Sequence, residues 1–221
     1  MFAGIVQTTG ELKTREEKSG KIYFQIKVKN FLKDIKIGDS ISCDGVCLTV
    51  IKKGADSFTV ELMPETLKLT RFKDSKAGDL INLEKSLKLR ERIDGHFVMG
   101  HVDGVGKVKE VTHPAPSGHP SQEDTHPAPS GHPSQEGMYT DLVIKVPRKV
   151  SKYLAYKGSV SINGVSLTIA GEGKDWIKVC LISHTLEVTN LSELKKGSLV
   201  NLEVDMIARY LEKFLREEKR N

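Results

Sequence analysis

Three stretches of the chain combine reactive and polar side chains in a way that strand packing does not require. Their reactive members are Cys43 and Cys47 in 40–49, His96 and His101 in 94–104, and Ser166 and Thr168 in 163–168. A histidine exchanges protons near neutral pH, and a cysteine or serine supplies a nucleophile, so these residue types predict acid–base and nucleophilic chemistry. A lone histidine is more often structural, but two within six residues, flanked by Gly95 and Gly100, favour a function.

Metal binding is the alternative for the cysteines and for some of the histidines. Cys43 and Cys47 could form half of a site, but no His/Cys pair follows at zinc-ligand spacing, which favours two small buried residues. Four further histidines lie in a Pro- and Ser-rich segment: His113, His119, His126 and His132. They could also hold a metal, although a surface insertion is favoured because closing a long loop costs little free energy. We therefore expect no metal site.

The composition is that of an ordinary water-soluble chain. Of 221 residues, 38% are hydrophobic and 29% charged, which excludes a chain disordered throughout. The net charge of +5 is scattered rather than clustered, so we expect no nucleic-acid partner. No apolar run approaches the ~20 residues that span a bilayer, and the N-terminus lacks a secretion signal. Three cysteines are too few for a disulfide framework. A cytoplasmic protein without a membrane partner is the expectation.

The elements that position the reactive residues occur twice. With a shift of 119 residues, 45–70 aligns with 164–189 without a gap, and 11 of the 26 positions are identical. At the same shift, the Asn-Leu-Glu sequence at 82–84 aligns with 201–203. This agreement is far above chance and predicts two copies of one fold, each of about 90 residues.

The beginnings of the two copies align at a different shift, of 96 residues, which places 4–6 on 100–102. The second copy must therefore carry 23 additional residues near its beginning. They fall in a tandem duplication, in which 112–124 and 125–137 match at 12 of 13 positions. This segment is rich in Pro, Ser, Gly and His and has no apolar face, so it predicts a solvated surface loop.

Hydrophobic residues alternate with polar ones within each copy, as at Ile22, Phe24 and Ile26. This period predicts about six short antiparallel strands per copy, which a small closed barrel would leave without exposed edges. Short helical turns are expected at 31–35, 66–69, 149–156 and 185–188. After Asp205, an apolar stripe at helical spacing predicts a C-terminal helix. The stripe consists of Ile207, Tyr210, Leu211, Phe214 and Leu215.

Five short motifs occur in order along nearly the whole chain. They are MFAGIVQ at 1–7, CLTV at 47–50, LMPETL at 62–67, GHFVMGHVDG at 95–104 and NGVSLT at 163–168. In content and spacing, the chain resembles the riboflavin synthase family, the lumazine-binding proteins with two barrels. No single motif is decisive, but together they are highly specific. Only the insertion at 112–137 has no counterpart in the family pattern.

The resemblance implies an all-β fold of two homologous six-stranded antiparallel Greek-key barrels in tandem, followed by a C-terminal α-helix. The implied domains are an N-terminal lumazine-binding barrel at 1–95, a C-terminal one at 96–204 and a trimerisation helix at 205–221. The implied assembly is a homotrimer in which the N-terminal barrel of one subunit faces the C-terminal barrel of a neighbour. An association with lumazine synthase is left open.

The implied reaction is that of a transferase and is the last step of riboflavin biosynthesis. Two molecules of 6,7-dimethyl-8-ribityllumazine exchange a four-carbon unit to give riboflavin and 5-amino-6-(D-ribitylamino)uracil. Each barrel would hold one lumazine, which accounts for the internal repeat. No cofactor is expected, since one substrate molecule is oxidised as the other is reduced, and no Gly-rich nucleotide loop occurs.

The resemblance also implies two sets of substrate-binding residues. The first set is Gly4, Ile5, Val6, Ser40, Cys47, Leu48, Thr49, Glu61, Leu62, Met63, Pro64, Glu65 and Thr66. The second set is Gly100, His101, Val102, Lys157, Asn163, Ser166, Leu167, Thr168, Cys180, Leu181, Ile182, Ser183, His184, Thr185 and Asp205. Lys157 would contribute across subunits. The chain departs from the family pattern at Ser183-His184, where Pro-Glu is frequent, and at Asn163, where Asp occurs; these changes affect single contacts and not the class.

The candidate catalytic residues are His101, Cys47, Ser166, Thr168 and His96. The C7 methyl group of the lumazine is acidic because its carbanion delocalises into the ring, so a histidine is a sufficient base. Threonine hydroxyls and backbone N–H groups would stabilise the anion. The nucleophile that adds to the second lumazine is left open between Cys47, Ser166 and a held water.

Two other classes of protein share this topology. A non-catalytic antenna protein that holds a lumazine or flavin can lack the equivalents of His101 and Cys47, but both are present here. An FAD-binding barrel of an oxidoreductase would be expected to show an Arg-x-Tyr-Ser/Thr signature and a nicotinamide domain, and neither occurs. The enzyme is therefore the favoured prediction.

Overall fold

The structure is a computed structural model that describes residues 1–113 and 139–218. All but the first two residues of the duplicated segment at 112–137 lie outside the described residues, and so do His119, His126 and His132. The predictions of a surface loop and of a metal-binding alternative for those histidines therefore stay predictions.

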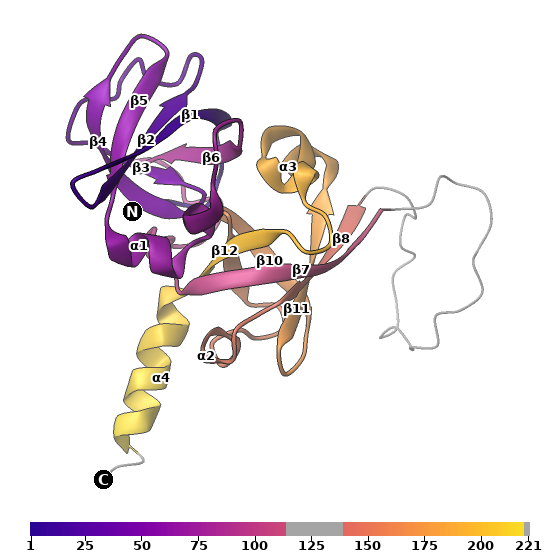
Figure 1. The fold of residues 1–221 in the computed structure, drawn as a ribbon. Helices are drawn as coiled ribbons and strands as arrows, with labels where there is room; N and C mark the ends of the chain where they lie inside the picture. The colour runs from indigo at the N-terminus through magenta and orange to yellow at the C-terminus, as the bar shows by residue number, and fades with distance from the viewer. Residues whose placement is uncertain (114–138, 219–221) are drawn as a thin grey trace.

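Each copy forms a closed six-stranded antiparallel barrel (Figure 1). The first barrel consists of β1 (Thr8–Lys18), β2 (Lys21–Lys27), β3 (Ser40–Cys43), β4 (Val46–Lys53), β5 (Ser57–Leu62) and β6 (Leu80–Lys85). The second consists of β7 (Gly104–Thr112), β8 (Tyr139–Lys145), β9 (Ser159–Ile162), β10 (Val165–Glu172), β11 (Trp176–Ile182) and β12 (Leu199–Val204). Around the barrels the order is β1-β2-β5-β4-β3-β6 and, equivalently, β7-β8-β11-β10-β9-β12. The predicted fold class is confirmed.

Equivalent short helices follow β5 and β11, another short helix follows β8, and one long helix follows β12. They are α1 (Pro64–Leu69), η1 (Arg71–Asp74), α2 (Arg148–Ser151), α3 (Ser183–Val188), η2 (Asn190–Glu193) and α4 (Met206–Glu218). The expected helical turn at 31–35 is wrong, because the segment forms only a turn at Lys33–Asp34. The side chains of Phe31, Leu32 and Ile35 are buried in the first core, so packing rather than a helical hydrogen-bond ladder fixes this loop.

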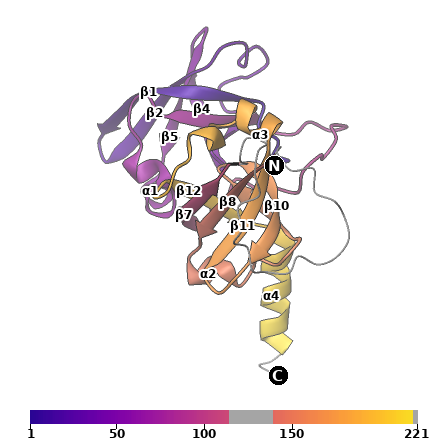
Figure 2. The ribbon, with the colours of Figure 1, turned by 90° about the vertical axis from the view of Figure 1, so that its right-hand side faces the viewer.

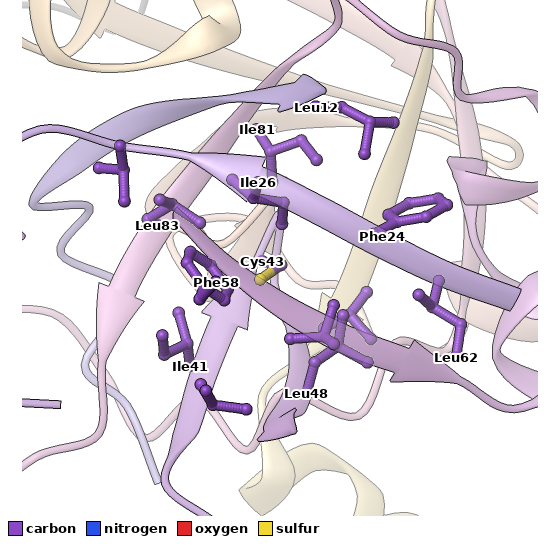
Figure 3. Close-up of a cluster of buried hydrophobic side chains, with 14 of the residues drawn as sticks. Leu12, Phe24, Ile26, Ile41, Cys43, Leu48, Phe58, Leu62, Ile81 and Leu83 are labelled. Carbon is purple, nitrogen blue, oxygen red and sulfur yellow. The ribbon is translucent and has the colours of Figure 1, made fainter. Parts of the chain in front are cut away.

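The alternating pattern places one face of every strand in a barrel core and the other face outside. In the first barrel, Phe24, Ile26, Phe58 and Leu62 point toward one another in the centre (Figure 3). Because consecutive side chains of a strand point to opposite faces, the residues between the core positions lie on the outside of the barrel. The candidate polar residues of β4 and β10 occupy such outward positions.

A buried polar network joins the two barrels around a pseudo-twofold axis. The side-chain amide of Asn82 donates to the carbonyl oxygen of Asn163 at 2.9 Å, and that of Asn201 donates to the carbonyl oxygen of Asp44 at 2.9 Å. Asn82 and Asn201 are separated by the 119 residues of the repeat, as are Asp44 and Asn163. The repeat therefore contributes to this interface twice, once from each side.

Helix α4 extends from the second barrel, away from the first (Figures 1 and 2). Its polar side is attached to that barrel by Arg209, which donates to Asp103 at 3.0 Å, and by Glu212, which accepts from Lys152 at 2.5 Å. The carboxylate of Asp205 accepts from the N–H of Ile207 at 2.9 Å and so caps the first turn. Among the described helices, none has both the length and the apolar character needed to cross a bilayer.

Candidate functional site

The segments that begin the two copies, 2–6 and 98–102 (the crossing segments), each pair with the barrel of the other copy. The N–H of Cys47, on β4 of the first barrel, donates to the carbonyl oxygen of Gly100 at 2.9 Å. The N–H of Ser166, on β10 of the second barrel, donates to the carbonyl oxygen of Gly4 at 2.8 Å. Each reactive strand is thus bordered by a segment from the other copy.

This exchange corrects the expected grouping of the substrate-binding residues. The sequence placed 4–6 with Cys47 and 100–102 with Ser166, whereas the structure pairs them the other way round. A short antiparallel bridge between Phe2 and Val98, with N–H···O distances of 2.8 and 3.1 Å, joins the two segments two residues before the glycines that pair with the strands. Beyond the bridge, Val102 packs on the first core and Val6 on the second.

The close approach of each segment to its strand requires glycine. Gly100 has φ +79°, and a Cβ there would lie 2.5 Å from the Cβ of Cys47. Gly4 has φ +74°, and a Cβ there would lie 2.7 Å from the Cβ of Ser166. A left-handed backbone and a backbone contact at this distance are both accessible to glycine without strain.

The first group of candidate residues lies on the outside of the first barrel. It consists of Ser40, Cys47, Leu48, Thr49, Glu61, Leu62, Met63, Pro64, Glu65, Thr66, Gly100, His101 and Val102. The side chain of Cys47 is half-buried, and those of Thr49 and His101 are exposed. Leu48 and Leu62 point into the core, so only their backbone faces outward. A hydrogen bond from Lys21 lowers the pKa of Glu61, which therefore stays ionised.

The second group contains a histidine–serine pair. The Nδ1 atom of His96 lies 2.7 Å from the Oγ atom of Ser166. Burial lowers the pKa of the His96 imidazole, against a smaller opposing effect of the Asp205 charge, so the ring is neutral near pH 7. Its Nε2 atom is buried without a hydrogen-bond partner among the described residues. A neutral imidazole at this distance is able to accept the proton of the serine hydroxyl.

The remaining members of the second group come from β10, β11 and the start of α3. They are Leu167, Thr168, Cys180, Leu181, Ile182, Ser183, His184 and Thr185, with Gly4, Ile5 and Val6 beside them. The Cys180 thiol donates to Asp141 at 3.0 Å, and mainly burial raises its pKa to about 11, so it stays protonated. Lys157 is exposed and has φ +64°. Asn163 lies apart, buried in the network between the barrels.

Two buried glutamates were not singled out by the sequence. Glu84 of β6 accepts from the N–H groups of Ala3 and Gly4, and Glu203 of β12 accepts from those of 99–101. Burial raises the pKa of both carboxyl groups to about 7, because it outweighs the stabilising N–H groups. The repeated Asn-Leu-Glu sequence was the available signal, but it gives no indication of what the carboxylates bind.

Comparisons with known proteins agree on one family. The family model of the lumazine binding domain matches residues 3–86 and 99–205. The chain is 36% identical to riboflavin synthase of Bacillus subtilis (strain 168), over 100% of this chain and 93% of that protein. It is 36% identical to riboflavin synthase of Photobacterium phosphoreum, over 99% and 91%. The structure of LumP complexed with riboflavin is similar in fold, with a TM-score of 0.77 and 24% identity over 92% of this chain and 99% of that chain.

Proposed function

Because the chain belongs to the lumazine binding domain family and, within it, to the riboflavin synthases, we propose that it converts 6,7-dimethyl-8-ribityllumazine into riboflavin. Two lumazine molecules enter; a four-carbon unit passes from one to the other, and the donor leaves as 5-amino-6-(D-ribitylamino)uracil. The two substrates supply all the atoms of both products, so the balance requires no further reactant.

The observation that carries this proposal is the duplicated binding surface. A backbone hydrogen bond of 2.9 Å joins Cys47 to Gly100, and an equivalent one of 2.8 Å joins Ser166 to Gly4. A reaction between two molecules of one compound needs two similar sites that hold the molecules in a fixed relation. The pseudo-twofold repeat supports the proposal because it gives each chain two similar surfaces, and in the proposed homotrimer the first surface of one subunit would face the second surface of a neighbour.

In this proposal the first and second groups of candidate residues form the first and second pockets, and each contains an acid–base group and a nucleophile. In the second pocket, neutral His96 accepts the proton of Ser166 or of a water beside it, and Thr168 donates to a developing anion. In the first pocket, His101 removes or returns the proton of the C7 methyl group when this pocket holds the donor lumazine, and Cys47 or a water adds to the ring when it holds the acceptor. The ribityl chains bind to polar groups of the short helices that follow β5 and β11, including the half-buried Thr66 of α1 and Thr185 of α3.

The working form in this proposal is a homotrimer held by α4. The apolar stripe of this helix is between 54% and 62% exposed, while the ion pairs of its polar side fix the helix on the second barrel. An exposed stripe in a fixed orientation is suited to packing against copies of itself. A cytoplasmic location fits the three free thiols.

The test is an anaerobic incubation of chelator-treated protein with dimethylribityllumazine alone. The expected yield is one riboflavin per two lumazines, measured by riboflavin fluorescence. Ser166→Ala should lower turnover by roughly 10²-fold or more, whereas Ser192→Ala, on an exposed position of η2, should leave it unchanged. Binding of the lumazine without any riboflavin would instead identify an antenna-like protein.

A further inference from the structure

We infer that Glu84 and Glu203 are positioning residues for the proposed reaction, and that each acts on the pocket of the barrel to which it does not belong. This inference rests on the proposed function. The observation that carries it is an arrangement that occurs twice. A buried glutamate binds the crossing segment of its own copy, and that segment lies against the reactive strand of the barrel to which the glutamate does not belong.

Glu203 holds the segment that borders the first pocket. Its carboxylate accepts from the N–H groups of Met99 at 2.7 Å, Gly100 at 3.0 Å and His101 at 3.1 Å. On its other side, the same segment accepts the N–H of Cys47. Glu203 stands on β12 of the second barrel, yet the groups that it fixes, the Gly100 carbonyl and the backbone of His101, belong to the first pocket.

Glu84 repeats this arrangement in the opposite direction. From β6 of the first barrel, it accepts from Ala3 at 2.7 Å and from Gly4 at 3.1 Å, while Gly4 accepts the N–H of Ser166 in the second pocket. The two glutamates are 4% and 2% exposed. An apolar side chain would fill such buried positions at a lower desolvation cost, but it would leave two or three N–H groups unpaired.

Hydrogen bonds from N–H groups to a carboxylate are stronger and more directional than those to a neutral acceptor. The crossing segments contain no helix or extended strand that would fix them otherwise. Loss of the carboxylate therefore allows the segment to shift against the reactive strand. The expected effect is a loss of ligand affinity and turnover at the bordered pocket, and not at the pocket of the glutamate's own barrel.

The cysteines offer a separate readout for each pocket. Cys47 is half-buried in the first group, Cys180 is exposed in the second, and Cys43 is buried. Alkylation of each thiol by N-ethylmaleimide at about pH 9 is timed by peptide mass spectrometry, with riboflavin as the protecting ligand. Because the pKa of the Cys180 thiol is raised to about 11, its slower alkylation is compared only with its own rate without ligand. The riboflavin concentration that gives half-protection then measures the affinity of each pocket in the same sample.

We expect Glu203→Gln to raise the half-protecting concentration at Cys47 by about tenfold or more and to leave that at Cys180 unchanged. Glu84→Gln should raise the half-protecting concentration at Cys180 and leave that at Cys47 unchanged. Glu172→Gln is the matched control, because this glutamate of β10 is exposed and pairs with Ile177 of β11 rather than with a crossing segment. Glu203→Asp and Glu84→Asp keep the charge but are one methylene shorter, and they should show the same crossed pattern with a smaller change.

The inference is supported if each glutamate variant weakens protection only at the thiol of the barrel to which the glutamate does not belong. If the Gln variants do not fold, the Asp variants alone decide. Equal loss at both thiols, or loss confined to the thiol of the mutated barrel, overturns it. Turnover of the unmodified protein is measured first. If that protein forms no riboflavin, the proposed function fails; if it does and the pattern is uncrossed, only the positioning role fails.

Discussion

Replacement of Gly100 by alanine tests the close approach on which the first pocket depends. At φ +79°, an L-residue costs about 1–2 kcal/mol relative to glycine. The new Cβ would also lie 2.5 Å from the Cβ, 2.7 Å from the N and 2.9 Å from the Cα of Cys47. Two of these atoms are backbone, so no rotamer change relieves the overlap. If the segment moves away, the hydrogen bond from Cys47 is lost, which adds about 1 kcal/mol.

The total expected loss for Gly100→Ala is therefore about 2–3 kcal/mol of unfolding free energy. Gly78→Ala is the control, because Gly78 has φ +95° and a Cβ at this position would have no heavy atom within 4 Å. It should lose only the backbone contribution, about 1–2 kcal/mol. Urea unfolding measures both values.

Activity separates the two variants more sharply than stability does. Gly100→Ala displaces the carbonyl that accepts from Cys47, so riboflavin formation should fall by about tenfold or more, since small misplacements in a site are costly. Gly78→Ala should retain full turnover. Equal stability losses in the two variants, or full turnover in Gly100→Ala, would refute the argument that this contact shapes the pocket.

The histidine–serine pair, the buried carboxylates and the terminal helix each give one more expectation. His96→Gln should lower turnover by roughly 10²-fold or more with little change in melting temperature, and matching losses of both would indicate a structural role. The pKa of Glu84 is about 7 in the fold against 4.5 in the unfolded chain, so its contribution to stability is present at low pH and is lost as the pH rises through about 7. Relative to Glu84→Gln, the unmodified protein should lose roughly 1–3 kcal/mol of unfolding free energy between about pH 5 and pH 8, and a constant difference would contradict the raised pKa. Replacing Leu211 and Phe214 by serine should lower the mass measured by light scattering and the turnover together, whereas Lys213→Ser should change neither.

The residue pattern predicted two copies of a small barrel and their strands, whereas the Greek-key order of the strands came from the family resemblance. The gapless alignment of 45–70 with 164–189 predicted two copies, and the alternation of core residues predicted their strands. The barrels confirm both, since alternation and burial are local consequences of strand geometry. The loop at 31–35 was misjudged because its three apolar residues are spaced as in a helical turn, although the core alone requires them.

The exchange of the crossing segments could not be predicted in the same way. The similarity of 4–6 to 100–102 shows that the segments are equivalent, but it holds equally well whichever barrel each one joins. The backbone pairings that distinguish the two arrangements, Cys47 with Gly100 and Ser166 with Gly4, involve main-chain groups that every residue carries, so the sequence does not mark them. For the same reason, the N–H partners of Glu84 and Glu203 left no trace in the sequence.

In the proposed function, the repeat makes the two pockets alike for binding, while three positions make them different for chemistry. Ile5 and His101 are equivalent residues, so the first pocket receives a histidine where the second receives an apolar side chain. Ser166 replaces Cys47 at the equivalent position of the reactive strand, and it is paired at 2.7 Å with His96, which lies in the connection between the copies. A reaction in which one lumazine gives up four carbons and an identical one receives them requires that the enzyme treat the two differently after binding both. In the proposed function, equivalent backbones with unequal acid–base groups meet that requirement, since the crossing segments bring His101 to the first barrel and Ile5 to the second.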